Sequence, residues 1–369
     1  MAETRSRSRI AVCSCVAVAL FWFGGGEAFA AGHVTTSGSH HGGGGGGGGG
    51  SASVSVSNPG NQISSTGRAV GLQIRASDSN GGVLNYSATG LPGGLNINTA
   101  TGLISGTPTS ATQSSVLVTA LDTNGGASGS TTFSWTVNAA YDISYPQCNT
   151  TLPPAASFSI VGVNDGIVLS ANPCLASQAN WGDGHGLQFY ANTADPGPAY
   201  SSHWPTSGQA SPQNCTTSDQ NSTACSFDYG YNAARDSFQD AVNAVAGTSI
   251  NPASVVWWFD VETGNSWQTL EGAYGQSPQY QANDAAALQG EVAGLQSEGV
   301  TTVGFYSTGY QWTQITGGTG STFGNNPAWL AGYSSQAQAM TGCGSASFTG
   351  GRVTYTQYPS GGFDADIPC

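Results

Sequence analysis

The sequence contains no lysine, and three of its seven arginines lie within the first nine residues. Beyond residue 30 the fixed positive charges are Arg68, Arg75, Arg235 and Arg352, against eighteen aspartate and glutamate residues. Nucleic acids and anionic membranes would be repelled by such a chain, so both are excluded as partners. The same shortage means that a buried acid here cannot usually be neutralised by a salt bridge.

Long apolar stretches are also scarce. The longest, Ile10–Phe23, follows the N-terminal arginines and precedes Ala28-Phe29-Ala30, an order typical of a secretory signal peptide, here residues 1–30. No later stretch approaches the roughly 18 apolar residues that a membrane span requires. We therefore expect a secreted, extracellular monomer, either free or associated with a cell wall.

Cysteine is uncommon but even in number once the predicted signal peptide, with two of the eight, is removed. Six cysteines in an oxidising compartment indicate disulfides, with about 15 pairings available. Proximity in the sequence favours three pairs: Cys148 with Cys174, Cys215 with Cys225, and Cys343 with Cys369. Since CxxC spacing is absent, no GxGxxG follows an expected strand and histidines are few, we expect no metal and no cofactor.

Two segments precede the larger C-terminal part. Residues 31–51 contain an unbroken glycine run and predict a flexible linker. Residues 52–139 show short alternating apolar runs separated by turn residues, the spacing of a β-sandwich. Within them, Gly90–Ile97 and Thr101–Pro108 resemble the Ig-like modules of bacterial surface and secreted proteins. That resemblance implies an all-β Ig-like sandwich that serves as a spacer or as an adhesive, glycan-contacting module.

The motif Ala-x-Asp-x-Asn-Gly-Gly occurs twice in this module, at 76–82 and 120–126. Its Asp and Asn oxygens would suit calcium, but the bidentate Glu and longer loop of a dedicated site are missing. Asn-Gly is foremost a hairpin-turn signal, so turns are the favoured reading.

Residues 140–369 alternate continuous apolar runs with helical patterns, which predicts a parallel sheet covered by helices. Helices are expected at 229–245 and 278–297. Seven strands are expected at 141–145, 158–163, 187–191, 254–262, 302–307, 328–333 and 353–358. Their number and the segment length favour an α/β barrel over an open sheet.

The fourth expected strand is an apolar run that closes with Asp260-Val261-Glu262. Residues two apart on a strand point the same way, so the two carboxyl groups share one side while Val261 packs on the other. In a barrel, reactive groups collect at the C-terminal ends of the strands. Two acids held close there should titrate apart, one pKa raised and one lowered, which supplies a proton donor and an anion together.

Several short motifs occur in the order seen in the family 25 glycoside hydrolases, which are lysozyme-like muramidases. These motifs are Tyr141–Ser144, Phe259–Glu262, Gly304–Ser307, Ala328–Tyr333, Gln357-Tyr358 and Phe363–Asp366. The resemblance spans residues 140–369 and implies an irregular (β/α) barrel of the TIM type. It also implies hydrolysis of the β-1,4 bond after N-acetylmuramic acid in peptidoglycan. Residues 203–227 are an insertion relative to that pattern.

The resemblance also implies roles for the acids. Glu262 would protonate the leaving oxygen and Asp260 would assist at the sugar, where the substrate's N-acetyl group serves as nucleophile. Asp142 and Asp364 would complete the acidic cluster. Asp366 stands where the family commonly has Asn, so either Asp364 or Asp366 could face the site.

Sugar sites need flat apolar faces and hydrogen-bonding groups. Asp165 follows the second expected strand and could hydrogen-bond a sugar, although Asn-Asp-Gly is also a turn. The other expected substrate-binding residues lie at or just after strand ends: Tyr190, Trp267, Tyr306, Trp312, Gln357 and Tyr358. Trp257 and Trp258 are expected to pack in the core instead.

Three hypotheses follow. The leading one is a secreted muramidase-like glycoside hydrolase acting on a cell wall. The second is a wall-binding protein without catalysis, and the third is a glycosidase for another polysaccharide.

Overall fold

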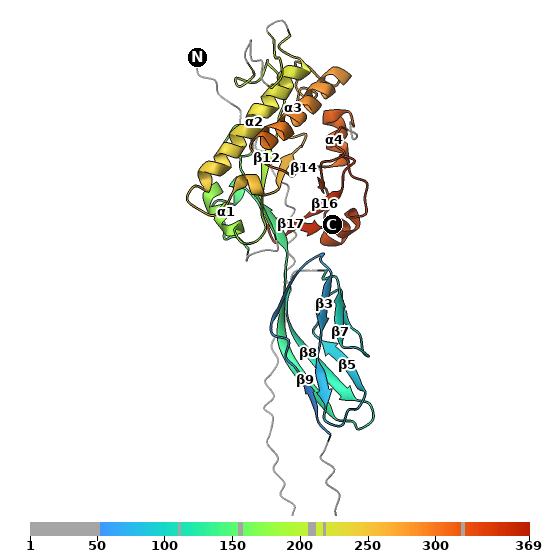
Figure 1. Cartoon of the computed structure of the whole chain (residues 1–369). Helices are drawn as coiled ribbons and strands as arrows, with labels where there is room; N and C mark the ends of the chain where they lie inside the picture. Colours follow the sequence, from blue (N-terminus) through green and yellow to red (C-terminus); the bar gives the residue numbers. More distant parts are fainter. Residues whose placement is uncertain (1–51, 110–111, 154–157, 206–211, 217–218, 319–321) are drawn as a thin grey trace, which may run out of the picture. The chain divides into compact units, whose positions relative to one another are not determined.

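The computed structural model describes residues 52–109, 112–153, 158–205, 212–216, 219–318 and 322–369 (Figure 1). The predicted signal peptide and linker, residues 1–51, lie outside the described residues. Two kinds of structure follow in the described part, β-sheets alone before residue 139 and strands mixed with helices after it.

The first described segment consists of β-strands around one core. The strands are β1 (Val54–Val56), β2 (Gln62–Ser65), β3 (Val70–Gln73), β4 (Ala76–Asp78), β5 (Leu84–Thr89), β6 (Leu95–Ile97), β7 (Leu103–Gly106), β8 (Thr112–Asp122) and β9 (Ser128–Asn138). They form sheets ordered β2-β9-β8-β5, β3-β7-β6 and β1-β4. Inward side chains such as Ile104, Val116 and Trp135 are almost fully buried, as the alternating pattern predicts.

The repeated Asp-x-Asn-Gly-Gly motifs form turns. Asp78 accepts hydrogen bonds from the backbone N–H groups of Asn80 and Gly82, at 3.0 and 2.9 Å. Asp122 does the same for Asn124 and Gly125, at 2.9 and 2.8 Å. Both carboxylates are occupied by the turns themselves. The motif at 120–126 joins the antiparallel strands β8 and β9 as a hairpin, whereas the motif at 76–82 joins β4 and β5, which pair with other strands.

In the second segment, eight strands close into a barrel in sequence order. They are β10 (Ala140–Ile143), β11 (Ser159–Gly162), β12 (Leu187–Asn192), β13 (Trp257–Asp260), β14 (Val303–Ser307), β15 (Ala328–Leu330), β16 (Val353–Ser360) and β17 (Phe363–Pro368). Strands β10 to β16 pair in parallel, and β17 pairs antiparallel with both β16 and β10. The predicted barrel is therefore present, but a regular TIM barrel has eight parallel strands.

The antiparallel strand has a local cause. Gly361 and Gly362 form a two-residue loop between the paired residues Ser360 and Phe363. Both glycines have positive φ, +63° and +89°, as a type I′ hairpin turn requires. The chain therefore reverses directly and leaves no room for a helix before the last strand.

The helices are α1 (Leu175–Gly182), α2 (Thr223–Ala244), α3 (Pro278–Ser297), α4 (Gly309–Thr316) and α5 (Gln336–Gly342), with 3₁₀ turns η1 (Tyr145–Gln147) and η2 (Pro252–Ser254). The expected helix at 278–297 is α3, whose N-cap Ser277 accepts from the N–H of Tyr280. Helix α2 begins six residues before the expected 229 because Ser222 caps it, within the segment interpreted as an inserted loop.

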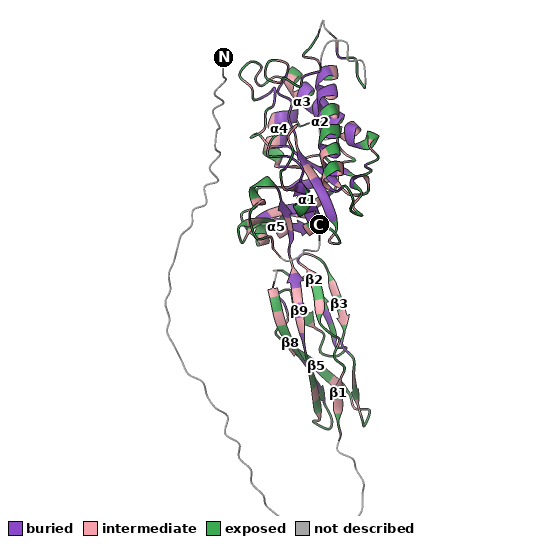
Figure 2. Ribbon diagram, turned by 90° about the vertical axis from the view of Figure 1, so that its left-hand side faces the viewer, coloured by how far each residue is buried: buried purple, intermediate pink, exposed green. Residues whose placement is uncertain are grey.

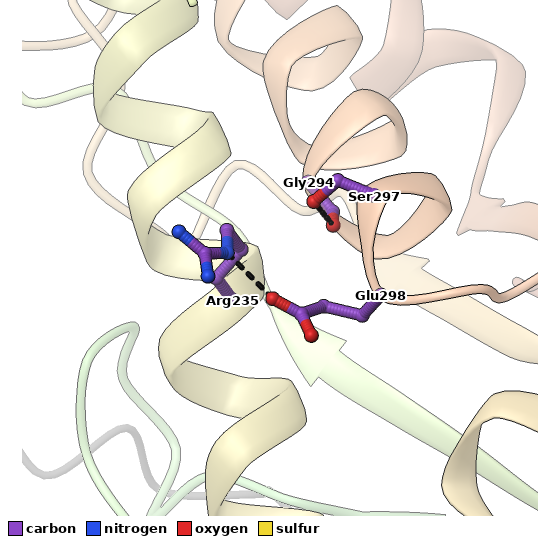
Figure 3. Close-up of polar contacts among 4 residues, drawn as sticks. All are labelled: Arg235, Gly294, Ser297 and Glu298. Carbon is purple, nitrogen blue, oxygen red and sulfur yellow. Dashed lines mark hydrogen bonds and ion pairs between the residues drawn. The ribbon is translucent and has the colours of Figure 1, made fainter. Parts of the chain in front are cut away.

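Helices α2 and α3 lie side by side on the barrel (Figure 1). Gly230 and Gly290 permit this, since a Cβ at either position would collide with backbone of the other helix. The one ion pair of the described residues joins the same helices, with Arg235 Nε donating to Glu298 Oε1 at 2.6 Å (Figure 3). Half of the Arg235 side chain is exposed, so this pair contributes little stability.

The barrel strands alternate between two cores. Trp258 points inward and packs with Trp329 and Tyr355. Trp257 points outward and packs against Phe189 of β12 and Phe238 of helix α2. Both tryptophans are fully buried, which confirms their expected structural role. Buried and exposed residues alternate along α2, which covers this outer layer (Figure 2).

Disulfides join the six described cysteines in the favoured pairs, Cys148–Cys174, Cys215–Cys225 and Cys343–Cys369. The last holds the end of β17 to the residue that follows α5. Within the described residues, no helix is both long and apolar enough to cross a membrane.

Candidate active site

A cavity of about 160 Å³ opens among side chains from seven of the eight barrel strands or the residues just after them. Its lining residues are Asp142, Tyr190, Asp260, Glu262, Tyr306, Trp329, Gln357 and Asp364. All four acids predicted to be catalytic therefore meet in one place, together with three of the residues predicted to bind substrate. Trp329 was missed, although its position between two small or aliphatic residues in Ala328-Trp329-Leu330 marks it as the inward-pointing residue of β15.

The end of β13 has the predicted alternation. Val261 is fully buried in the outer core, and its N–H donates to the carbonyl of Tyr306 at 2.9 Å. Asp260 and Glu262 on either side of it both line the cavity. Asp260 is 8% exposed, while Glu262 is more open to solvent. Glu262 is thus the more accessible of the two acids.

Asp260 is held firmly from one side. Its Oδ2 accepts a hydrogen bond from Asn192 Nδ2 at 2.8 Å, and its carbonyl oxygen accepts from Thr193 Oγ1 at 2.6 Å and Asn265 Nδ2 at 3.0 Å. Its Oδ1 is buried without a partner among the described residues. Because a buried acceptor without a donor is costly, this oxygen is suited to receive a hydrogen bond from a ligand.

The electrostatics of the pair differ from the expectation of one raised and one lowered pKa. Burial and then the charge of Glu262 raise the pKa of Asp260 well above its usual value. Burial also raises the pKa of Glu262, opposed by a hydrogen bond from Gln311. Expecting a lowered pKa was wrong because burial raises both pKa values and no arginine among the described residues stabilises either anion.

The segment after Glu262 is anchored by the core. Trp267 Nε1 donates to the carbonyl of Glu262 at 2.8 Å, and Gln311 Oε1 accepts from the N–H of Thr263 at 2.6 Å. Trp267 and Trp312 are 0% and 1% exposed and pack in the hydrophobic core. The prediction that these two tryptophans bind sugar is therefore wrong, since neither offers a face to a ligand.

A second hydrogen-bonded chain crosses the cavity. Tyr306 Oη donates to Gln357 Oε1 at 2.7 Å, and Gln357 Nε2 donates to Asp142 Oδ2 at 3.0 Å. Burial, followed by the charge of Asp364, raises the pKa of Asp142 to about 8. Gln357 thus links the Tyr306 hydroxyl to the Asp142 carboxyl group and fixes the orientation of that acid.

The structure separates the two acids of β17. Asp364 pairs with Asp142 across the strands and lines the cavity, and burial raises its pKa. Asp366 is fully buried below, where its Oδ1 accepts from Trp329 Nε1 at 2.8 Å. The prediction that Asp366 binds substrate is therefore wrong. Its buried carboxyl group instead contacts Trp329 and Asp142 and holds these two side chains in place.

Two further expectations can be placed. Tyr358 is 6% exposed and packs outside the barrel with Ala339 and Ile367, so its predicted sugar contact is wrong. Neighbouring strand residues face opposite ways, and Gln357 is the one that faces the cavity. Asp165 is exposed in the loop after β11, away from the cavity lining, and its role stays a prediction.

Chemically, the cavity concentrates carboxyl groups whose pKa values burial raises, beside the hydroxyl of Tyr306 and the apolar face of Trp329. Such a site can donate a proton and stabilise a developing positive charge. Over the described ranges, no three His, Cys, Asp or Glu side chains are grouped so as to hold a metal ion.

Comparison with known proteins gives matches at both ends of the chain, and no curated protein matches the sequence. Muramidase from Trichobolus zukalii is 16% identical, covering 63% of this chain and 93% of that one, with a TM-score of 0.39. The lysozyme of Streptomyces coelicolor is 14% identical over 62% and 90%, with a TM-score of 0.34. Drosophila N-cadherin is 17% identical over 23% of this chain and only 33% of its own length, with a TM-score of 0.21. Residues 52–138 match the family model described as "Putative Ig domain", which agrees with the Ig-like resemblance noted in the sequence.

Proposed function

We propose that this protein is a glycoside hydrolase that cleaves β-1,4 bonds of peptidoglycan. The observation that carries the proposal is the convergence of Asp142, Asp260, Glu262 and Asp364 on one cavity at the ends of the barrel strands. The order of the family 25 motifs in the sequence supports the same reaction. The N-terminal signal pattern and the three disulfides support export to an oxidising compartment.

In this proposal Glu262 is the general acid. It is the more open acid of the pair, and its raised pKa keeps the proton on the carboxyl until the glycosidic oxygen takes it. The bond between that oxygen and the anomeric carbon then breaks, and the carbonyl oxygen of the substrate's own N-acetyl group bonds to the carbon. A water molecule subsequently displaces this oxygen and returns its proton to the Glu262 carboxylate.

Asp260 assists at the sugar. Its unpartnered Oδ1 accepts the N–H of the acetamido group and thereby turns the amide carbonyl toward the anomeric carbon. Asn192 fixes the other oxygen, so the carboxyl group cannot rotate away. Asp142 and Asp364 add negative charge when they ionise, which favours the cationic transition state over the neutral ground state.

The experiment compares the purified full chain with Glu262→Gln on a peptidoglycan suspension, following turbidity and the release of reducing ends. Clearing by the wild type and loss of clearing in the variant are expected. Sedimentation with walls without new reducing ends would instead favour the non-catalytic wall-binding protein. Reducing ends from another member of a glycan panel, with none from peptidoglycan, would favour a different polysaccharide.

A further inference from the structure

The exposed large hydrophobic side chains of the barrel segment share one position in the fold. Within the described residues they are Tyr145, Ile167, Tyr200, Leu270 and Tyr310, with exposed fractions of 40, 64, 50, 40 and 72%. Each lies in the segment that follows one of five consecutive strands, β10 to β14. The described loops that precede the strands, at the other end of the barrel, expose no such residue. Scattered apolar residues would not all lie at the end where the carboxyl groups open.

Two of these positions connect directly to the cavity. Tyr310 begins α4 and precedes Gln311, whose Oε1 accepts from the N–H of Thr263, the residue after Glu262. On the other side, Tyr145 follows Ser144, which lies beside the cavity residue Tyr190, since a Cβ at Gly162 would meet both side chains. Strand β10 lies opposite β14 in an eight-stranded barrel ordered by sequence. Tyr145 and Tyr310 therefore flank the acids from opposite sides.

The loop after β11 is shaped to expose Ile167. Leu169 is the one non-glycine residue of the described chain with a positive φ, 59°, a conformation that costs of order 1–3 kcal/mol. This backbone conformation lets Val168 and Leu169 pack on the buried cluster around Trp204 while the side chain of Ile167 remains exposed to solvent. Ser170 Oγ donates to the carbonyl of Ile167 at 2.6 Å and closes the loop.

The same loop approaches Tyr145. A Cβ at Gly166, which has a φ of +74°, would collide with the Tyr145 ring, so the backbone before Ile167 rests on that ring. Tyr145 and Ile167 thus form one apolar surface beside the cavity. With Tyr310 opposite, we call these three residues the rim platform.

The cavity also needs such a surface. Its volume of about 160 Å³ is below the roughly 300–1,000 Å³ of sites that enclose a whole ligand. A polymer cut there must be held mainly outside it. Sugar rings present flat faces of C–H groups that suit aromatic and aliphatic side chains. Binding an uncharged sugar in this way requires no cation, and among the described residues no arginine lies at the cavity.

We propose that the rim platform binds the sugar rings on either side of the scissile bond, with Tyr145 and Ile167 holding one arm of an uncharged glycan backbone and Tyr310 the other. This rests on the proposed glycosidase function, because it takes the acids as the point of cleavage. It predicts a binding groove that runs across the barrel mouth from β10 and β11 to β14.

The test is isothermal titration calorimetry of the full chain with two probes: a soluble hexamer of β-1,4-linked N-acetylglucosamine and solubilised, uncrosslinked peptidoglycan strands. Glu262→Gln is the background, so that the probes are not consumed. Tyr145→Ala and Tyr310→Ala should each raise the Kd about tenfold, and the double variant about a hundredfold because the sites are separate. Tyr310→Phe, which keeps the ring, should bind nearly as the parent does.

Ile63→Ala is the control, since Ile63 is an exposed apolar residue of the Ig-like segment, and it should leave the Kd unchanged. Thermal unfolding of each variant confirms that it is folded. Equal affinity in the parent and both tyrosine variants, or a parent that binds neither probe, overturns the platform. A chain that binds through these tyrosines but releases no reducing ends keeps the platform and loses the proposed hydrolysis, so the two failures are distinct.

Discussion

Three of the carboxyl groups buried outside the cavity interact with one another, and their ionisation should contribute to how stability depends on pH. Asp195 lies in the loop after β12, and Asp284 and Glu291 lie on α3. Asp284 accepts from the N–H groups of Gln268 and Thr269 at 3.0 and 3.2 Å, and Gln268 Nε2 donates to Asp195 at 3.0 Å. The network therefore ties α3 to the loop that follows β13.

Burial raises the pKa of Asp195 to about 6, opposed by hydrogen bonds from Ser226, Gln268 and Asp284. Burial and then the charge of Asp195 raise the pKa values of Asp284 and Glu291 well above normal. The folded chain then binds more protons than the unfolded chain. Stability is accordingly greatest below the unfolded pKa, near 4, and is lost as pH rises toward the folded pKa.

For Asp195 the window runs from about pH 4 to pH 6, so about two pKa units at roughly 1.4 kcal/mol each give a loss of about 3 kcal/mol. Asp284 and Glu291 extend the loss to higher pH. At about 2–4 °C of Tm per kcal/mol for a segment of this size, Asp195 alone accounts for about 6–12 °C between pH 4 and pH 6.5.

The perturbation is Asp195→Asn. The amide keeps an oxygen for Gln268 and places its nitrogen at Oδ1, which has no donor among the described residues. Differential scanning calorimetry from pH 4 to pH 8 should show a Tm that falls with pH in the wild type and falls less in the variant. The exposed Asp236→Asn on α2 is the control and should follow the wild type. A wild-type Tm that is flat or rises over this range, or an Asp195→Asn curve parallel to it, would refute the reasoning.

Three further predictions follow. Because the pKa of Glu262 is raised, hydrolysis should persist above the pH at which an ordinary glutamate has ionised, and the rate should fall at higher pH. A rate that climbs steadily from pH 5 to pH 9 would contradict this prediction. Replacing Cys343 and Cys369 by alanine should cost about 3–4 kcal/mol in urea unfolding, since the bridge closes a 26-residue separation, and an unchanged midpoint would count against it. Trp312→Ala should cost about 3–5 kcal/mol but leave the glycan Kd of the folded protein unchanged, whereas a weakened Kd would restore the sugar contact rejected above.

The sequence was most informative where one local rule decides the geometry. Side chains alternate along a strand with a period of two. Asp260 and Glu262 could therefore be assigned to one side of the strand, and Val261 to the other, without tertiary information. The disulfide pairs followed because each joins cysteines close in the chain. The hairpin at Gly361 and Gly362 carried an equally local signal, and overlooking it left β17 unpredicted.

Residues beyond the strand ends were harder to predict. Trp267 and Trp312 follow strands, as sugar-binding aromatics often do, yet both lie in the core. Trp267 Nε1 donates to the carbonyl of Glu262, and Trp312 lies on the buried side of α4. The exposure of Tyr145 and Tyr310 likewise depends on the packing of loops from other strands. No periodicity in the sequence distinguishes an aromatic residue that faces solvent from one that folds inward.

The most direct test of the account is the rate of reducing-end release from peptidoglycan by the wild type, Glu262→Gln and Asp236→Asn at the pH optimum. Removing a general acid typically costs about 10²–10⁴-fold in rate, and we predict a loss of that size for Glu262→Gln. Asp236→Asn, at an exposed acid of α2 outside the cavity lining, should lose little. Wild-type turnover that survives in Glu262→Gln would contradict the assignment of Glu262 as the acid.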